Sequence, residues 1–230
     1  ALASGLFTAE SQLDTSPGVM RVGSHQVRDV RHFGELDIEG VLRKSSNVGA
    51  AQLALALERG RVWQVLNEVG LGQPTGIAFP GEAGGYLAPV PSNRPVERAT
   101  LAFGYGLSVT NLQIARAYTA LATDGYLLTP RLLANGENPA RQPVLEPALA
   151  REVRRMLAEV TRSGGTATQA AISGYAVAGK TGTSRKAVAG GYAEGRYVST
   201  FAGMAPVDDP RFIAVVTIDE PGGDAYYAGP

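Results

Sequence analysis

The sequence contains no cysteine, which excludes disulfide bonds and thiolate-bound metals. It also has no net charge, because lysine plus arginine and aspartate plus glutamate each number 21. A neutral chain has no overall field to attract nucleic acid or an anionic membrane, so we expect no nucleic acid partner. No apolar run approaches the roughly 20 residues that span a bilayer, and the first residues lack a signal-peptide pattern. We therefore expect no membrane or export segment among these residues.

Lysine is also scarce. Lys44, Lys180 and Lys186 are the three lysines, whereas arginine occurs 18 times. An ammonium is a compact charge whose pKa the surroundings can lower, whereas a guanidinium stays charged. Each lysine is therefore a candidate for chemistry, although biased residue usage explains each one equally well.

The hydrophobic content of 44% over 230 residues is enough for one sizeable core. Helical spacing dominates the first part of the chain, and period-two alternation begins after Gly165. Three strands are predicted, at 174–183, 196–206 and 211–221. We predict one domain of α+β class, in which mainly helical residues 1–168 pack on antiparallel strands within residues 169–230.

Helical patterns predict segments at 35–44, 48–60, 61–70, 110–125 and 146–160. The fourth of these is strongly apolar and should be buried, with Thr110 as its N-cap and Gly125 as its stop. Residues 72–98 are rich in glycine and proline, which indicates a long surface loop.

The stretch "YAVAGKTGTSRK" places a lysine at the end of an apolar strand, beside two threonines. Lys180 and the neighbouring hydroxyls can hold a carboxylate, and Gly182 lets another backbone approach the strand closely. The Thr183 N–H can then act as an oxyanion donor. A bend glycine and a solvated lysine at a strand end explain the same residues without any function.

A second candidate element is "RKSSNVGAA", where Ser45 and Asn47 lie two residues apart at a break between predicted helices. A hydroxyl and a carboxamide at this spacing can face one cleft. Ser46 or Asn47 can equally serve as the N-cap of the helix that follows. We expect both, because a cap fixes the backbone that presents the neighbouring side chains.

Ser-x-Asn and Lys-Thr-Gly are two of the three signatures of penicillin-binding proteins and serine β-lactamases. The blocks "GVLRKSSNVGAAQLALAL", "ATLAFGYGLSVTNLQIARAY", "GKTGTSRK" and "STFAGMAPVDDPRFIAVVTIDEP" resemble the transpeptidase domain of class B penicillin-binding proteins, most of all the septal, cell-division member. The resemblance covers nearly the whole chain. It implies the penicillin-binding protein and serine β-lactamase fold, with a cleft between a helical subdomain and the strand that holds Lys-Thr-Gly.

The resemblance further implies a serine-type DD-transpeptidase that cross-links peptidoglycan stem peptides ending in D-Ala-D-Ala and binds β-lactam antibiotics. It implies no cofactor and no metal. The expected location is the periplasmic or extracellular face of the cytoplasmic membrane, with anchoring by an N-terminal helix that this chain lacks. The expected protein partners are the division glycan polymerase and other divisome proteins.

By the same resemblance, Ser45 relays a proton, Asn47 hydrogen-bonds the substrate backbone and Lys180 supplies positive potential. The implied substrate-binding residues are Thr181, Gly182, Thr183, Arg185, Tyr197, Tyr226 and Tyr227. For the three tyrosines, ordinary packing is an equally good explanation. We expect Asn47 and Lys180 to face each other across one groove sized for an extended peptide.

The third family signature, Ser-x-x-Lys, is absent from the sequence, because no serine has a lysine three positions later. No substitute catalytic triad is apparent, because His25 and His32 lie in a segment that is predicted to be peripheral. We therefore expect the chain to begin just after the catalytic serine and lysine, and to be inactive alone. The closing helix and two flanking strands of the family are also expected to be missing, so the fold is expected to be incomplete at both ends.

Two alternatives remain open from the residues. A β-lactamase or DD-carboxypeptidase shares the fold, although the sequence offers no local signature for a glutamate that activates a deacylating water. A non-catalytic, penicillin-recognising binding module would keep the cleft and lose the chemistry.

Overall fold

The computed structural model describes residues 1–134 and 139–222. Its helices are α1 (Ile38–Lys44), α2 (Asn47–Ala56), α3 (Arg61–Glu68), α4 (Pro95–Leu101), α5 (Asn111–Ala122) and α6 (Pro147–Glu159), with short 3-10 turns at Leu2–Ser4 and Thr168–Ala170. The short strands are β1 (Leu13–Asp14), β2 (Val19–Val22), β3 (His25–Arg28), β4 (Glu35–Leu36), β5 (Tyr86–Leu87), β6 (Leu107–Ser108), β7 (Tyr126–Leu128) and β8 (Arg141–Pro143). The long strands are β9 (Ala178–Val188), β10 (Gly191–Ala205) and β11 (Phe212–Asp219). The predicted α+β class is confirmed.

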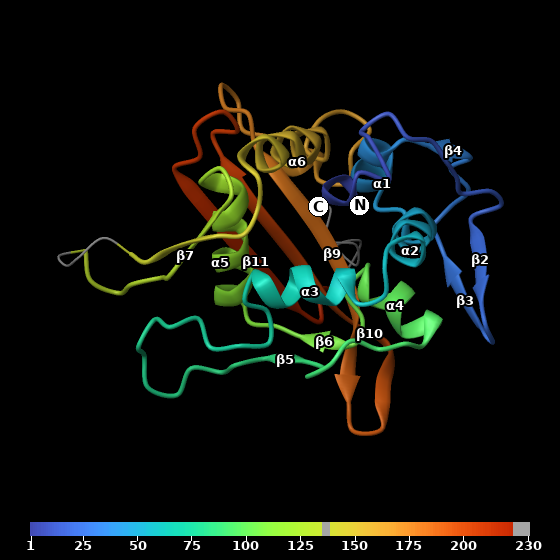
Figure 1. Cartoon of the computed structure of the whole chain (residues 1–230), viewed down its shortest axis with the longest axis horizontal. Helices are drawn as coiled ribbons and strands as arrows, with labels where there is room; N and C mark the ends of the chain where they lie inside the picture. The colour runs from blue at the N-terminus through green and yellow to red at the C-terminus, as the bar shows by residue number, and fades with distance from the viewer. Residues whose placement is uncertain (135–138, 223–230) are drawn as a thin grey trace.

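The three long strands form one antiparallel sheet in the order β11-β10-β9 (Figure 1). All three predicted strands are present, and the turn that joins the last two contains the predicted Asp208, Asp209 and Pro210. The first two strands are longer than predicted, because β9 and β10 continue as a hairpin that turns at Gly190 and carries an irregularity between Tyr192 and Tyr197. This hairpin projects below β5 and β6 in Figure 1.

Helices α5 and α6 cover one face of the sheet and enclose the main core (Figure 1). The buried members of this core are Leu157, Ala158, Val160, Ala167, Ala178, Met204 and Val207. They come from α6, the segment that follows it, and the strands β9 and β10. The end of α6 and the start of β9 are therefore held in one packed unit.

Helices α1 to α3 confirm the three predicted helical segments between residues 35 and 70, with ends that differ by a few residues. Each end has a local cause. The Asp37 side chain caps α1 by accepting from Gly40 N at 2.6 Å. Gly60, the N-cap of α3, and Gly70, which follows its C-cap Val69, adopt left-handed conformations with φ of 85° and 82° and so bound this helix.

Two predictions about the middle of the chain were incomplete. The segment 72–98 is not all loop, because α4 begins at Pro95, which suits a first helical turn, and β5 lies within the segment. Helix α5 has the predicted N-cap, Thr110, which forms a capping box with Gln113. However, Gln113 and Ala120 are the residues of α5 that are fully buried, so this helix is half-covered rather than enclosed.

Among residues 1–134 and 139–222, no helix combines the length and the hydropathy that crossing a membrane requires.

Candidate active site

The site is centred on a contact between the two candidate motifs. Lys180, near the start of β9, donates a hydrogen bond from Nζ to Ser45 Oγ at 2.6 Å, and a second one to the Thr181 carbonyl at 2.9 Å. Ser45 ends α1, so the contact joins the helical part of the chain to the sheet. The motifs predicted to form one cleft therefore do meet.

Lys180 is half-buried, and burial lowers the pKa of its ammonium from 10.5 to about 8. At neutral pH the side chain is still mostly charged, so it acts as the donor toward Ser45. A group whose pKa lies near the working pH can also exchange a proton efficiently. The Lys180–Ser45 pair can therefore offer positive charge to a carboxylate and pass a proton through the serine hydroxyl.

Ser45 holds an unusual backbone conformation. Its φ of 57° and ψ of 46° lie in the left-handed region, where a non-glycine residue is uncommon. Its N–H donates to Leu42 O at 3.2 Å, which closes α1. The reversal directs the chain from α1 into α2 and leaves the exposed Ser45 side chain at the corner, where Lys180 reaches it.

Ser46 is the N-cap of α2, as one of the two predicted alternatives states. Its hydroxyl accepts from Gly49 N at 2.9 Å and donates to Asp29 Oδ2 at 2.7 Å. Asp29 Oδ1 accepts in turn from Val48 N at 3.0 Å. Asp29 thus holds the start of α2 from the end of β3, and the sequence alone did not indicate this role.

The side-chain amide of Asn47 donates to the Arg28 carbonyl at 3.0 Å, and the residue of this turn that contacts Lys180 is Ser45. The predicted placement of Asn47 opposite Lys180 stays a prediction. In the part of the chain that the structure describes, no donor contacts the Asn47 side-chain oxygen. That oxygen can accept a hydrogen bond from a bound peptide.

Strand β9 is an edge strand, since its one strand partner among the described residues is β10. The Thr181 carbonyl accepts from Lys180 and so points away from β10. Residues two apart in a strand present their backbone groups to the same side, which directs the Thr183 N–H to the same edge. A Cβ atom added to Gly182 would meet no atom within 4 Å, so the space above the strand is open at this point.

The predicted substrate-binding residues do not lie on a single face. By strand alternation, Lys180 and Gly182 share one face of β9 and Thr181, Thr183 and Arg185 share the other, so the two sets flank the same edge of the strand from opposite sides. Lys180 contacts the Thr181 carbonyl, whereas the Thr181 hydroxyl lies 2.8 Å from the hydroxyl of Thr166.

Of the predicted aromatic residues, Tyr197 is half-buried on β10 and lies opposite Arg185. Tyr226 and Tyr227 lie outside the described residues. The sequence analysis missed another aromatic contact, in which Tyr192 of the hairpin packs edge-to-face on Tyr105 with ring centroids 5.5 Å apart. Both tyrosines stand in glycine-rich stretches, "FGYG" and "GGYAEG", and this shared context was the available signal.

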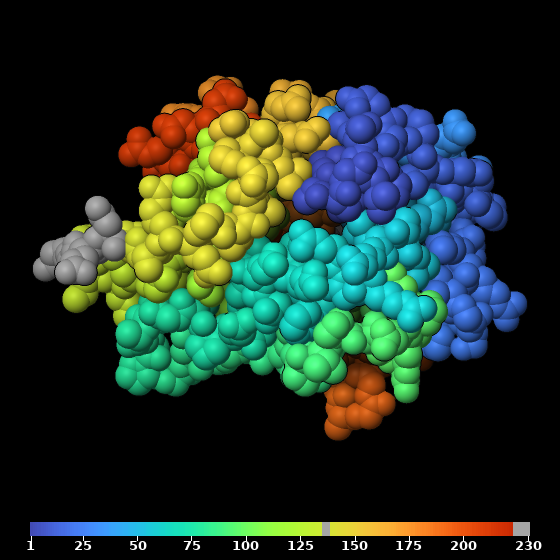
Figure 2. Space-filling view, viewed as in Figure 1, coloured from blue at the N-terminus to red at the C-terminus, as the bar shows by residue number. Residues whose placement is uncertain are grey.

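The surface is hollowed beside the N-terminal residues, where Figure 2 shows a depression between the blue and cyan segments. An apolar groove of about 410 Å³ lies there between several helices. Its lining includes Leu2, Ile38, Val41, Leu42, Leu53, Leu57, Val65, Leu149, Val153 and Met156. Val41 and Leu42 belong to α1, so the groove adjoins the helix that ends at Ser45.

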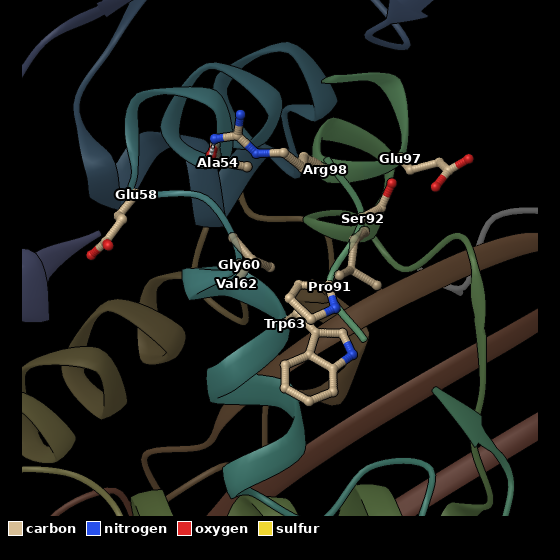
Figure 3. Close-up of a pocket in the computed structure, with 10 residues that line it drawn as sticks. Ala54, Glu58, Gly60, Val62, Trp63, Pro91, Ser92, Glu97 and Arg98 are labelled. Atoms are coloured by element: carbon tan, nitrogen blue, oxygen red, sulfur yellow. Dashed lines mark hydrogen bonds between the residues drawn. The ribbon is translucent and has the colours of Figure 1, made fainter. Parts of the chain in front are cut away.

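A second, much smaller cavity of about 20 Å³ lies between α2, α3 and α4 (Figure 3). Arg98 on its rim donates to the carbonyls of Ala54, Leu55 and Leu57, at 3.0 to 3.4 Å, and so caps the end of α2. Trp63 donates from Nε1 to Ala88 O at 2.6 Å. These contacts explain the cavity as a structural junction, and neither Ser45 nor Lys180 lines it.

All 230 residues match the family model described as penicillin binding protein transpeptidase domain. The chain is 42% identical over 229 residues to the "Probable peptidoglycan D,D-transpeptidase PenA" of Neisseria gonorrhoeae and 37% identical over 230 residues to the "Peptidoglycan D,D-transpeptidase FtsI" of Escherichia coli K12. It covers 39% of each of these relatives, so it spans about two fifths of their length.

A solved structure, the apo transpeptidase domain of Burkholderia pseudomallei penicillin-binding protein 3, superposes with a TM-score of 0.92 at 39% identity. The match covers 99% of this chain and 70% of that structure. A structure described as a peptidoglycan glycosyltransferase from Burkholderia ambifaria matches with a TM-score of 0.88 at 37% identity, over 100% of this chain and 71% of that one.

Proposed function

The chain belongs to the penicillin-binding protein transpeptidase family, and on that basis we propose that it forms the substrate cleft of a septal peptidoglycan DD-transpeptidase. One observation carries the proposal. The Lys180 ammonium donates to Ser45 Oγ at 2.6 Å, although the two residues are 135 positions apart. The fold therefore joins the Lys-Thr-Gly strand and the Ser-x-Asn turn at one point, as acyl transfer on a peptide requires.

In the proposed reaction, a stem peptide ending in D-Ala-D-Ala lies along the free edge of β9. A serine hydroxyl attacks the carbonyl carbon between the two D-alanines, and the Thr183 N–H stabilises the oxyanion that forms there. The Asn47 side-chain oxygen accepts from a peptide N–H, and Lys180 attracts the terminal carboxylate.

The proton path uses the same contact. The proton that the nucleophilic serine gives up reaches the departing D-alanine nitrogen through the Ser45 hydroxyl, which Lys180 holds in place, and the peptide C–N bond breaks. An amine of a neighbouring strand then attacks the ester carbonyl and forms the new amide bond. Its proton leaves through the same hydroxyl path, and the nucleophilic serine is restored.

The proposal requires a nucleophile that the Ser-x-x-Lys pattern would supply, and the 230 residues lack that pattern. We therefore assign the nucleophile to another part of a longer protein, in keeping with the greater length of the relatives. The apolar groove beside α1 is compatible with a helix that brings such a serine to the cleft. As part of the same proposal, the cleft binds β-lactams and faces the periplasm or cell exterior. The protein would be anchored by an N-terminal helix and work with the division glycan polymerase and other divisome proteins.

Covalent labelling of the complete protein with a fluorescent penicillin tests the function. We expect a stable labelled band, loss of labelling in Lys180→Met, and normal labelling in the matched control Lys186→Met on the same strand. Label that forms and is quickly lost indicates a β-lactamase. No covalent label on the folded protein indicates a binding module, and either result overturns the transpeptidase assignment.

A further inference from the structure

The segment between α6 and β9 bridges the two walls of the cleft. At one end, the last two residues of α1 donate to its carbonyl groups, with Arg43 bonded to Ser163 O and Lys44 Nζ lying 2.7 Å from Gly164 O. Lys44 directly precedes Ser45. The position of Ser45 is therefore tied to the loop formed by residues 163–166, which we term the bridging loop.

At its other end, the bridging loop contacts the strand. The hydroxyl of Thr166 lies 2.8 Å from the hydroxyl of Thr181, in a half-buried contact. Thr181 follows Lys180 on β9, and its carbonyl accepts from that lysine. The loop thus touches the residue next to each member of the Lys180–Ser45 pair.

The backbone of the bridging loop has little freedom. Gly164 has a φ of 80°, and a Cβ on it would lie 2.8 Å from Arg43 Nη2. A Cβ on Gly165 would lie 2.1 Å from the Val160 carbonyl oxygen, closer than any real contact. Both glycines are therefore required for the loop to reach α1 and β9 together.

We propose that Thr166 is a positioning residue that aims the Thr181 hydroxyl at the carboxylate of the bound ligand. The inference rests on the proposed function. A hydroxyl has one hydrogen to donate, so Thr181 can donate to an anion only if it does not give that hydrogen to Thr166, which must then be the donor in their contact. Thr166 is placed to be that donor, and such a chain of hydroxyls strengthens the outer bond.

A purely structural role makes a different prediction. If Thr166 only stabilises the loop, its loss lowers folding stability and slows acylation by every ligand alike. If it aims the Thr181 hydroxyl, its loss selectively slows acylation by ligands that carry the anionic group. Benzylpenicillin and its methyl ester differ in that carboxylate, so their acylation rates separate the two roles.

The experiment measures the second-order acylation constant of the complete protein with both compounds. We expect Thr166→Val to lower the constant for benzylpenicillin about three- to tenfold and to leave that for the methyl ester within about twofold of wild type. Thr166→Ser should restore the benzylpenicillin rate. Thr168→Val is the matched control, because Thr168 is exposed two residues further on.

An equal fall for both compounds, or no change for either, overturns the positioning role. Thermal unfolding of each variant shows whether an equal fall comes from lost stability. Failure of the wild-type protein to form any acyl-enzyme instead overturns the proposed function, so the two failures are distinguished by the wild-type rate.

Discussion

The carboxylate of Asp29 accepts two hydrogen bonds, one from the Ser46 hydroxyl at 2.7 Å and one from the Val48 N–H at 3.0 Å. A side chain at the end of the β2–β3 hairpin thus holds the first turn of α2. A carboxylate at a helix N-terminus also interacts favourably with the helix dipole. The turn that carries Ser45 and Asn47 therefore depends on a residue outside both motifs.

Replacing Asp29 should destabilise the protein and disturb the cleft. We expect Asp29→Ala to lower the free energy of unfolding by about 1–3 kcal/mol, because the buried Ser46 loses a hydrogen-bond partner. Penicillin acylation should slow in the same variant. Urea unfolding and fluorescent labelling measure the two effects, with Glu194→Ala on the exposed hairpin as the control. Unchanged stability would contradict this role for Asp29.

The low pKa of Lys180 predicts two opposite dependences on pH. Acylation should fall as pH rises through about 8, since the ammonium loses the charge that attracts a carboxylate. Folding stability should instead rise with pH in this range, because the Lys180 amine binds its proton more tightly in the unfolded chain than in the folded one. The charged Lys180 lowers the free energy of unfolding. This unfavourable contribution is fully present below about pH 8 and is relieved as the pH approaches 10.5.

A pH–rate profile and urea unfolding at several pH values check both trends. In Lys180→Arg the falling limb of the rate profile should move to higher pH, because a guanidinium stays charged. In Lys180→Met the rise in stability between pH 8 and 10 should become smaller than in wild type. If the falling limb of the pH–rate profile does not move in Lys180→Arg, the ionisation that controls acylation belongs to another group.

Two glycines near the cleft should respond to alanine in opposite ways. Gly165→Ala places a Cβ 2.1 Å from the Val160 carbonyl oxygen and should cost about 1–3 kcal/mol of stability. Gly182→Ala meets no atom within 4 Å and should change stability by less than about 0.5 kcal/mol. It should nevertheless slow acylation, because the added methyl group enters the space above β9. If the two variants lost stability and acylation rate to the same extent, the ligand would not use the space above Gly182.

The sequence predicted those features whose causes are local. Thr110 was identified as an N-cap because its hydroxyl bonds within its own helix turn. The three long strands were found because alternation is visible residue by residue. Lys180 and Ser45 were brought together by recognition of the family motifs rather than by any local pattern.

Features that depend on distant partners were missed. Asn47 bonds to the carbonyl of Arg28, which lies 19 positions earlier, and nothing near Asn47 encodes that choice. The extension of the β9–β10 hairpin was hidden because glycines in "GGYAEG" read as loop, whereas strand pairing continues beyond them. Helix α4 was hidden in the same way by the prolines that precede it.

Because lysine is scarce in this chain, amine-directed reagents can be used to probe Lys180 in the cleft. Lys44 bonds to Gly164 O, and Lys186 lies 2.6 Å from two carboxylates at the end of β11, which raise its pKa. Lys180, with its pKa of about 8, is half-deprotonated in mildly alkaline buffer, and neutral amines are the form that electrophilic reagents modify. Amine-directed dyes or cross-linkers that modify Lys180 should therefore report on the occupancy of the cleft, with Lys44, whose pKa burial also lowers, as the second lysine to monitor.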